Sequence, residues 1–474
     1  MFRKTEKVDL LSYIRNGQEL SARQKIFLVV TLSTPSVLAQ LTSVLMQYID
    51  ASMVGKMGAD ASAAIGLVAS TTWLFGGVCS SGAAGFSIQA AQYIGAKNFE
   101  KAREVLRQSL VAILLFTVVL AAIGAAISFS LPVWLGGAKE IQWEASLYFL
   151  IYVCSLPAMG MGRLAGSMLQ CSGNMKIPGI LNSLMCVLDV IFNACLIFES
   201  FTVSFAGVQL RLPGAGLGVA GAALGTALAH IVTAVLMLYF LCFQSPIFKL
   251  QRGESFRLQK PCIKRAVTIS LPIAVERVVV SGAMVVATRI VAPLGITAIA
   301  ANSFAITAES LCYMPGYGIA DAATTLTGQS IGAGRNKLAV SFGRITVGLG
   351  MAIMACTGAL MFFAAPFMIG ILTPNAAVRE LGIQILRIEA YAEPLFGASI
   401  VVAGVLRGAG DTLVPSIMNF VSLWAVRLVL SYFLAKPYGL VGVWIAMAVE
   451  LCFRGIIFLI RFERKKWLRI KMEL

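Results

Sequence analysis

Two stretches of the chain, Gln92-Tyr-Ile-Gly-Ala-Lys-Asn-Phe-Glu-Lys-Ala102 and Gln329-Ser-Ile-Gly-Ala-Gly-Arg-Asn-Lys-Leu-Ala339, repeat one pattern 237 positions apart. The same offset relates seven further pairs: Pro35 and Pro272, Gly58 and Gly295, Ala64 and Ala301, Pro157 and Pro394, Gly173 and Gly410, Pro178 and Pro415, and Asn182 and Asn419. One ungapped register over this length predicts that the chain contains two copies of one structural plan.

The register changes once, near the end of each copy. Gly218-Val-Ala-Gly221 matches Gly439-Leu-Val-Gly442 at an offset of 221, so the first copy carries 16 extra residues. These residues, 198–213, alternate in polarity, and alternation of this kind predicts a β-hairpin outside the membrane.

The composition of this duplicated chain indicates a membrane protein. Of the 474 residues, 58% are hydrophobic and only 13% are charged, whereas soluble domains average about 25% charged residues. The apolar stretches are long enough to cross a bilayer, which takes about 20 residues each. We count twelve, at 26–54, 61–94, 102–130, 141–169, 174–198, 218–244, 263–292, 297–331, 338–367, 376–407, 412–436 and 439–461.

The predicted fold is therefore an all-α polytopic membrane protein with twelve transmembrane helices in two pseudo-symmetric six-helix lobes. We divide the chain into an N-terminal tail (1–25), an N-lobe (26–245), a linker (246–262), a C-lobe (263–461) and a basic C-terminal tail (462–474). Glycines Gly95, Gly332, Gly173 and Gly410 are predicted to adopt positive φ in the short turns between helices.

The formal net charge of +16 follows the predicted topology. Counted over the tails and loops, 28 basic residues fall on the side of the termini and 5 on the other side. By the positive-inside rule both tails are cytoplasmic, and the expected location is the cell inner membrane. Because the charge is spread over alternate loops of a hydrophobic chain, nucleic-acid binding is excluded.

Six spans per half make the repeat parallel, and parallel repeats are typical of secondary transporters, whose substrate sites lie near the bilayer midplane between the repeats. An enzyme is not expected, since the HExxH, GxSxG and Walker sequences are absent. The ten cysteines form no C-x-x-C pair, so no cofactor is expected. We expect a chain that functions as a monomer, in contact with lipid and with a small organic substrate.

Four segments give the chain a family resemblance: Gln47-Tyr-Ile-Asp-Ala-Ser-Met-Val-Gly-Lys-Met-Gly58, Gly328-Gln-Ser-Ile-Gly-Ala-Gly334, Gly404-Val-Leu-Arg-Gly-Ala-Gly-Asp-Thr412 and Gly439-Leu-Val-Gly-Val-Trp444. Their order and duplication resemble the multidrug and toxic compound extrusion (MATE) family over residues 26–465. The resemblance implies an antiporter that exports organic, often cationic or aromatic, drugs and toxic compounds by alternating access, coupled to entry of H⁺ or Na⁺.

Ionisable residues inside the spans are the functional candidates, because a charge in hydrocarbon is costly. The first lobe has two such acids, Asp50 and Asp189, with no base in the middle of its spans. An acid without a cationic partner binds a proton readily in an apolar setting, so these two are the predicted coupling residues. Gln47, Asn182 and Asn193 are predicted to orient them or to supply oxygen ligands to Na⁺.

The resemblance supports the same pair. Asp50 matches the first-span aspartate used for cation coupling across much of the family, and Asp189 matches a fifth-span aspartate of one branch. That branch often has Asn one turn before this aspartate, where the chain has Met185. Sodium-coupled members carry acids at positions that are Val280 and Phe396 here.

The second lobe has more acids, and most have bases nearby in sequence. We predict that Glu276, Glu389, Glu393 and Glu450 hold Arg277, Arg387, Arg427 and Arg454 in a buried polar network; contact with substrate or a second cation site is the alternative. Glu276, Glu389 and Glu393, together with Tyr48, Met46 and Phe192, are also candidates for the substrate cavity.

Two other transporter classes share features with this chain. A lipid-linked oligosaccharide flippase of the same superfamily usually has about fourteen spans and a basic central cavity, and it stays as the alternative because of the arginines in the second lobe. A major-facilitator transporter would carry Gly-x-x-x-Asp-Arg-x-Gly-Arg-Arg after span two, where this chain has Gly95-Ala-Lys-Asn-Phe-Glu-Lys-Ala102.

Overall fold

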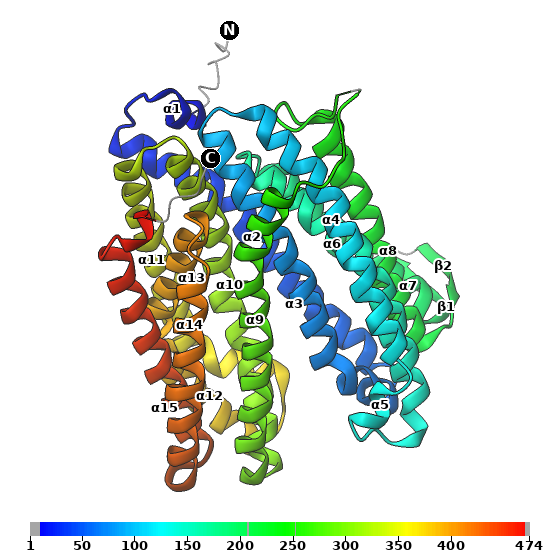
Figure 1. Cartoon of the computed structure of the whole chain (residues 1–474). Helices are drawn as coiled ribbons and strands as arrows, with labels where there is room; N and C mark the ends of the chain where they lie inside the picture. Colours follow the sequence, from blue (N-terminus) through cyan, green and yellow to red (C-terminus); the bar gives the residue numbers. More distant parts are fainter. Residues whose placement is uncertain (1–9, 206–207, 252, 470–474) are drawn as a thin grey trace.

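The computed structural model describes residues 10–205, 208–251 and 253–469, and its elements form two helical lobes (Figure 1). The N-lobe contains α2 to α8, preceded by a short helix α1. Its elements are α1 (Leu10–Asn16), α2 (Ala22–Gly55), α3 (Ala59–Gly95), α4 (Phe99–Ile127), α5 (Leu131–Trp134), α6 (Lys139–Cys171), α7 (Lys176–Ile197), β1 (Glu199–Phe205), β2 (Val208–Ala215), α8 (Gly218–Tyr239) and the π-helix η1 (Phe240–Gln244).

The C-lobe follows the linker. Its elements are α9 (Lys260–Val291), the 3₁₀ turn η2 (Ala292–Leu294), α10 (Ile296–Gly332), α11 (Asn336–Leu372), α12 (Ala376–Ala390), α13 (Glu393–Gly408), α14 (Leu413–Val421), the π-helix η3 (Ser422–Arg427), α15 (Leu428–Glu463) and the 3₁₀ turn η4 (Lys466–Arg469). The predicted hairpin is present in the N-lobe as β1 and β2, which pair antiparallel.

Together these helices cross the membrane twelve times. Nine helical segments of the described ranges are long and apolar enough to span a bilayer, and α12 with α13 forms a tenth span bent by 57°. The 37-residue α10 is as long as α3 but carries Glu309 and Asp321, which lower its hydropathy. The stretch Leu413–Glu463 is 51 residues long, far beyond the roughly 30 Å of hydrocarbon, and it reverses at Gly439, where φ is 58°. Figure 1 shows this reversal between α14 and the end of α15.

Helix boundaries repeat at the offset found in the sequence. Adding 237 takes the ends of α3 to those of α10, the start of α4 to that of α11, and the start of α7 to that of α14. It also takes the ends of α6 to the start of α12 and the end of α13. The two copies differ at their shared proline, because α6 runs on through Pro157 whereas the C-lobe helix breaks just before Pro394.

The lobes are joined by a crossed pair of hydrogen bonds. The Gln92 amide of α3 donates to the Gly408 carbonyl of α13 at 3.2 Å, and the Gln329 amide of α10 donates to the Cys171 carbonyl of α6 at 2.8 Å. Donors and acceptors are each 237 positions apart, so the two bonds are equivalent under the pseudo-two-fold relation. We call these two bonds the glutamine pair.

Two glycines allow the close approach beside the glutamine pair. A Cβ on Gly95 would lie 2.1 Å from the Gln329 carbonyl oxygen, and one on Gly332 would lie 1.9 Å from that of Gln92. The predicted positive φ is wrong for these two residues, which are helical and needed for packing between lobes. It is confirmed for Gly173 and Gly410, at 94° and 86°.

Contacts near the chain ends define one end of the bundle. Arg335 donates to the Tyr13 carbonyl of α1 at 3.0 Å, Lys25 of α2 donates to Ser341 of α11 at 3.2 Å, and Arg344 of α11 binds Glu463 of α15 at 2.8 Å. We call this the terminal end. The helices of the two lobes diverge toward the opposite end (Figure 1).

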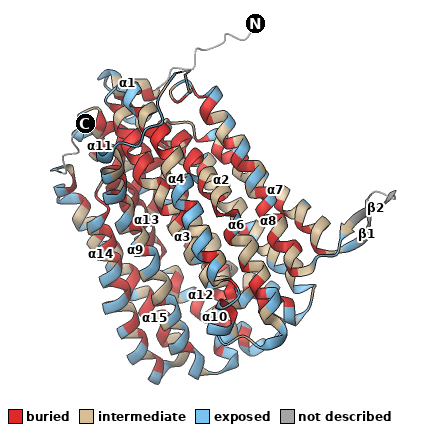
Figure 2. Cartoon of the chain, turned by 45° about the vertical axis from the view of Figure 1, so that its right-hand side comes forward, coloured by how far each residue is buried: buried red, intermediate tan, exposed pale blue. Residues whose placement is uncertain are grey.

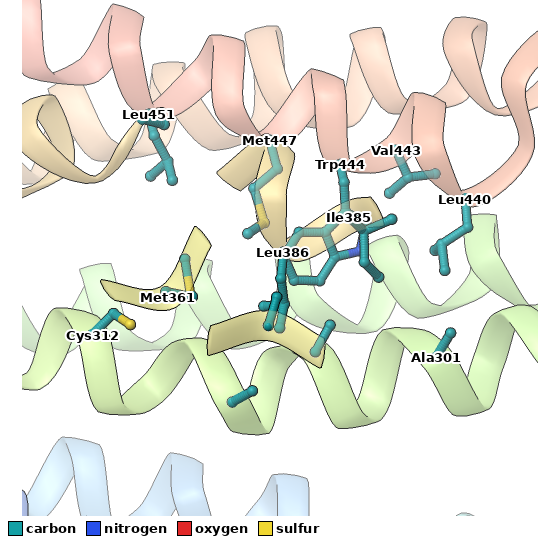
Figure 3. Packing of buried hydrophobic residues seen from close by; sticks show 14 of the residues in the cluster. Ala301, Cys312, Met361, Ile385, Leu386, Leu440, Val443, Trp444, Met447 and Leu451 are labelled. Atoms are coloured by element: carbon teal, nitrogen blue, oxygen red, sulfur yellow. The ribbon is translucent and has the colours of Figure 1, made fainter. Parts of the chain in front are cut away.

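Burial follows the same gradient. In α10 nearly every residue from Pro315 to Gly332 is buried, whereas burial is intermittent before Pro315. Figure 2 shows the buried residues concentrated toward α1 and α11 at the terminal end. Each lobe keeps its own apolar core as well. In the C-lobe, Trp444 and Met447 of α15 pack on Leu386 of α12 (Figure 3), and the Trp444 indole N–H donates to Asn302 at 2.9 Å.

The linker is attached to the N-lobe. Glu254 binds Arg107 of α4 at 2.7 Å, and Gln259 hydrogen-bonds Glu104 and Gln108 of the same helix. Burial raises the pKa of the Glu254 carboxyl, but the Gln251 N–H and Arg107 outweigh burial, and the pKa lies below its usual range. The linker carboxylate is therefore ionised at neutral pH.

Candidate functional site

The two predicted coupling aspartates meet inside the N-lobe. Asp50 of α2 and Asp189 of α7 lie within hydrogen-bond reach of each other. The Asn193 amide nitrogen donates to Asp50 Oδ1 at 3.1 Å and to Asp189 Oδ2 at 3.0 Å. Because an amide nitrogen carries two hydrogens, one side chain donates to both carboxyl groups. We call Asp50, Asp189 and Asn193 the aspartate site.

Neighbouring helices position this site. Asp189 and Asn193 are four residues apart in α7 and therefore share a helix face. In α8, a Cβ on Gly225 would lie 2.1 Å from Asn193 Oδ1, so only glycine leaves room for the amide. Thr226 of α8 lies close to Asp189, and Tyr148 of α6 lies close enough to interact electrostatically with both aspartates. Sequence reasoning missed Thr226 and Tyr148, which come from distant helices.

The chemistry of the donor set fits a small cation. Asp189 and Asn193 are buried, and Asp189 Oδ1 and Asn193 Oδ1 have no hydrogen-bond partner among the described residues. Two carboxyl groups this close cannot both stay charged without a compensating cation. A shared proton provides that compensation, and the unpartnered oxygens are the kind of ligand that Na⁺, a hard cation, binds.

The other predicted N-lobe residues lie outside the aspartate site. Asn182 is half-buried two turns before Asp189, and its backbone carbonyl accepts a hydrogen bond from the Cys186 thiol. Gln47 is exposed, and in the described part of the chain it has no hydrogen bond to either aspartate. Met46 and Phe192 are half-buried. Tyr48 instead joins the lobes, since its hydroxyl donates to the Thr307 carbonyl of α10 at 2.8 Å.

Glu276 of α9 is held by a base other than the predicted one. It binds Arg407 of α13 at 3.2 Å and accepts hydrogen bonds from Ser416 and Asn419, both at 2.8 Å. The predicted partner, Arg277, lies close enough to interact electrostatically but forms no ion pair with it. The reason is geometric, because adjacent residues of a helix point in different directions.

Two more C-lobe acids depart from the predicted network. Glu450 is paired as predicted, with Arg454 at 3.2 Å. Glu389 and Glu393 are fully buried, and within the described ranges none of their carboxyl oxygens has a hydrogen-bond partner. The predicted pairing is wrong for both, since they lie on either side of the 57° bend and turn toward Glu309 inside the lobe.

A cavity of about 180 Å³ with polar and apolar lining lies between the lobes. It is lined from both lobes, by α3 and α6 on one side and by α9, α10 and α13 on the other, and its charged residues are Arg277, Asp321 and Arg407. Glu276, Glu389 and Glu393, predicted for a substrate cavity, do not line it because they are buried beneath it or within the C-lobe.

One base was misplaced by sequence reasoning. Arg163 is one of the 28 basic residues assigned to the tails and loops on the side of the termini, and the expectation of no base in the middle of an N-lobe span is unaffected by it. The structure places it in α6, two turns before the helix ends at Cys171. It is exposed and lies within electrostatic reach of Asp321 and His230. The apolar sequence around a helix end gave no signal for this position.

Comparison with known proteins agrees with this architecture. The MatE family model matches residues 35–195 and again 272–433, so it matches the first five membrane helices of each repeat, and the two matches start 237 positions apart. The chain belongs to the MatE family. It is a multi-pass membrane transporter and not an enzyme.

The relatives of this MatE chain carry consistent names. A probable multidrug resistance protein NorM of Thermotoga maritima is 25% identical over 444 residues, covering 93% of this chain and 92% of the relative. The NorM protein of Pseudomonas aeruginosa is 28% identical over 466 residues, covering 92% and 89%.

Solved structures show the same fold. A MOP superfamily transporter from Pyrococcus furiosus superposes with a TM-score of 0.88 at 19% identity, covering 98% of this chain and 100% of that chain. The Vibrio cholerae MATE transporter VcmN in the bent form gives 0.83 at 18% identity, covering 94% and 98%. The two-lobe, twelve-helix architecture is therefore that of MATE transporters.

Proposed function

We propose that this MatE protein exports small organic compounds, including cationic drugs, in exchange for H⁺ or Na⁺ bound at the aspartate site. The observation that carries the proposal is the bridge from Asn193 to both Asp50 and Asp189 inside an apolar lobe. The multidrug resistance names of the relatives support the substrate class. The twofold architecture supports alternating access between the lobes.

The coupling step follows from the position of the two aspartates on different helices. Asp50 belongs to α2, which packs on α10 of the other lobe, whereas Asp189 belongs to α7. Binding of a cation removes the repulsion between the carboxyl groups and draws α2 toward α7. Release of the cation restores that repulsion. A ligand that binds one conformation more tightly shifts the population toward that conformation. Cation binding at the aspartate site therefore changes the preferred packing of α2 against the C-lobe.

The direction of transport follows from the charge distribution. The excess of basic residues places the terminal end in the cytoplasm, and we assign both chain ends and the linker to that side of the cell membrane. The glutamine pair then closes the cytoplasmic side, and the lobes diverge toward the outside. In this state, exchange of substrate for H⁺ or Na⁺ takes place from the external medium.

The test is transport of ethidium by the purified protein in proteoliposomes, with a pH gradient and a Na⁺ gradient imposed separately. We expect one gradient to drive ethidium transport and the other to have no effect. Asp50→Asn should reach the membrane in normal amount and lose the gradient-driven component. Wild-type transport without either gradient, or unchanged transport by Asp50→Asn, would overturn the coupling mechanism.

A further inference from the structure

Arg277 of α9 is a cation within a membrane span that has no protein partner. It is exposed, and in the described part of the chain it forms no hydrogen bond and no ion pair. The nearest acid, Glu276, is occupied by Arg407, Ser416 and Asn419. An arginine at membrane depth is costly and is kept for a function.

The position of Arg277 is fixed by the opposite lobe. A Cβ on Gly77 of α3 would lie 3.5 Å from the Cβ, Cγ and Cδ atoms of Arg277, so the aliphatic part of the side chain packs across this glycine. The guanidinium group is thereby held at the inter-lobe cavity of about 180 Å³. Both lobes therefore contribute to the same binding position.

The other charges of the cavity are compensated. Arg407 has its ion pair with Glu276, and Asp321 lies within electrostatic reach of Arg163 and Arg407. Of the two arginines that line the cavity, Arg277 is the one without an ion pair among the described residues, because the acid within its electrostatic reach, Glu276, is already paired with Arg407. A negatively charged group of a ligand supplies the missing partner.

Few other groups in the cavity have hydrogens to donate. Ser80 and Ser81 donate to backbone carbonyls of their own helix, and Thr325 donates to the Gln170 carbonyl. Their hydroxyl hydrogens are used, whereas the Ser167 hydroxyl and the Gln170 amide, which line the same cavity, donate no hydrogen bond within the described ranges. A planar guanidinium matches the planar oxygens of a carboxylate.

We propose that the inter-lobe cavity is a substrate subsite in which Arg277 binds a carboxylate group of the exported compound, so that carboxylated aromatic compounds are substrates. The volume suits one or two aromatic rings. It does not suit an oligosaccharide linked through pyrophosphate to a lipid, the other oxyanion source for such a cavity. This inference rests on the proposed export function and names a substrate class with a charge opposite to that of ethidium.

A matched pair of fluorescent ligands tests the subsite. 7-Diethylaminocoumarin-3-carboxylate and its ethyl ester share one ring system, and the ester replaces the carboxylate charge with a neutral ethyl ester. Binding to the detergent-purified protein is measured by fluorescence anisotropy for the wild type, Arg277→Ala and Arg277→Lys. The control is Arg289→Ala, which removes an exposed arginine near the other end of the same helix.

We expect the wild type to bind the carboxylate at least about tenfold more tightly than the ester, because a charge-assisted bond is worth this much or more. Arg277→Ala should lose the preference, Arg277→Lys should keep part of it, and Arg289→Ala should keep all of it. Equal binding of acid and ester by the wild type, or an unchanged preference in Arg277→Ala, would overturn the proposal. Displacement of the dye by farnesyl pyrophosphate at lower concentration than by benzoate would also overturn it, in favour of a lipid-linked ligand.

Transport separates this inference from the proposed function. In proteoliposomes, Arg277→Ala should still move ethidium, while its transport of the coumarin carboxylate falls to the level of the ester. If the wild type binds the acid selectively but transports neither dye, the export function fails and the subsite stands. If Arg277→Ala loses ethidium and coumarin transport equally, the arginine serves the transport cycle in general, and its assignment to the carboxylate is wrong.

Discussion

The two lobes share one backbone plan but carry different chemistry at equivalent positions. In the N-lobe, the Tyr152 hydroxyl donates to the Thr72 carbonyl at 3.0 Å. At 237 positions further on, the C-lobe has Glu389 and Glu309, both buried. Conversely, the C-lobe has alanine and valine, Ala287 and Val426, where the N-lobe has Asp50 and Asp189.

This difference separates what the fold requires from what the transport cycle requires. Helix boundaries, prolines and the glycines between the lobes repeat, so they serve the architecture. The acids do not repeat at equivalent positions, so they are not required by the shared architecture. The N-lobe acids are joined by Asn193, whereas the C-lobe acids Glu389 and Glu393 have no hydrogen bond within the described residues. Only the N-lobe set has the geometry of a formed site.

The largest expected effect is at the aspartate site. Asp189→Asn removes one of the two acids and should abolish gradient-driven ethidium transport, because a single carboxyl group no longer forms a pair whose repulsion changes with cation binding. Transport rates in proteoliposomes measure the loss. The control, Asp60→Asn, changes an exposed aspartate at the start of α3 and should transport normally. Normal transport by Asp189→Asn would contradict the contrast between the lobes.

A smaller effect of opposite sign is expected in the C-lobe. Glu393→Met replaces a buried, unpartnered carboxyl group with an apolar side chain of similar length. It should raise the stability by about 1–3 kcal/mol, which is the cost of an unsatisfied buried polar group, and leave transport intact. Thermal unfolding of the purified protein and ethidium transport measure the two quantities.

Glu389→Met sharpens this comparison. Glu389 lies within electrostatic reach of Arg427, an interaction that Glu393 lacks, so its replacement should be less stabilising. If either variant folds but loses transport, the C-lobe acids take part in the cycle. The interpretation of Glu389 and Glu393 as substrate-cavity residues would then be restored.

The smallest effects test the shared architecture. Gln92→Ala and Gln329→Ala each remove one bond of the glutamine pair, and each should destabilise the protein by about 0.5–1.5 kcal/mol. Gln92→Ala should have the larger effect of the two, because it also removes the hydrogen bond that Gln92 Oε1 accepts from Arg265, whereas Gln329 Oε1 has no partner among the described residues. Gln47→Ala, at an exposed glutamine of α2, is the control and should change little. A large effect at one glutamine and none at the other would break the equivalence.

Much of the fold was predictable because turns are marked locally. Gly173 and Pro178 flank the same short connection in the N-lobe as Gly410 and Pro415 do in the C-lobe, and the helix ends follow them. The spacing within α7 also placed Asn193 beside Asp189. By contrast, partners far apart in sequence were not predictable, as Glu276 shows by binding Arg407 rather than the adjacent Arg277. Tertiary packing decides which side of a helix contacts the other lobe, and this cannot be predicted from the sequence of that helix alone.

The glutamine pair has a consequence for how the chain is built. Gln92 of the first copy donates to Gly408 of the second, and Gln329 of the second copy donates to Cys171 of the first. The two acceptors occupy equivalent positions in the two copies. In a symmetric dimer such a surface is called isologous, since the same patch serves both partners. The contact between the lobes is therefore a subunit interface within one polypeptide, and residues 245–259 act as a covalent tether between two subunits. Two separately expressed halves retain every hydrogen bond of the glutamine pair.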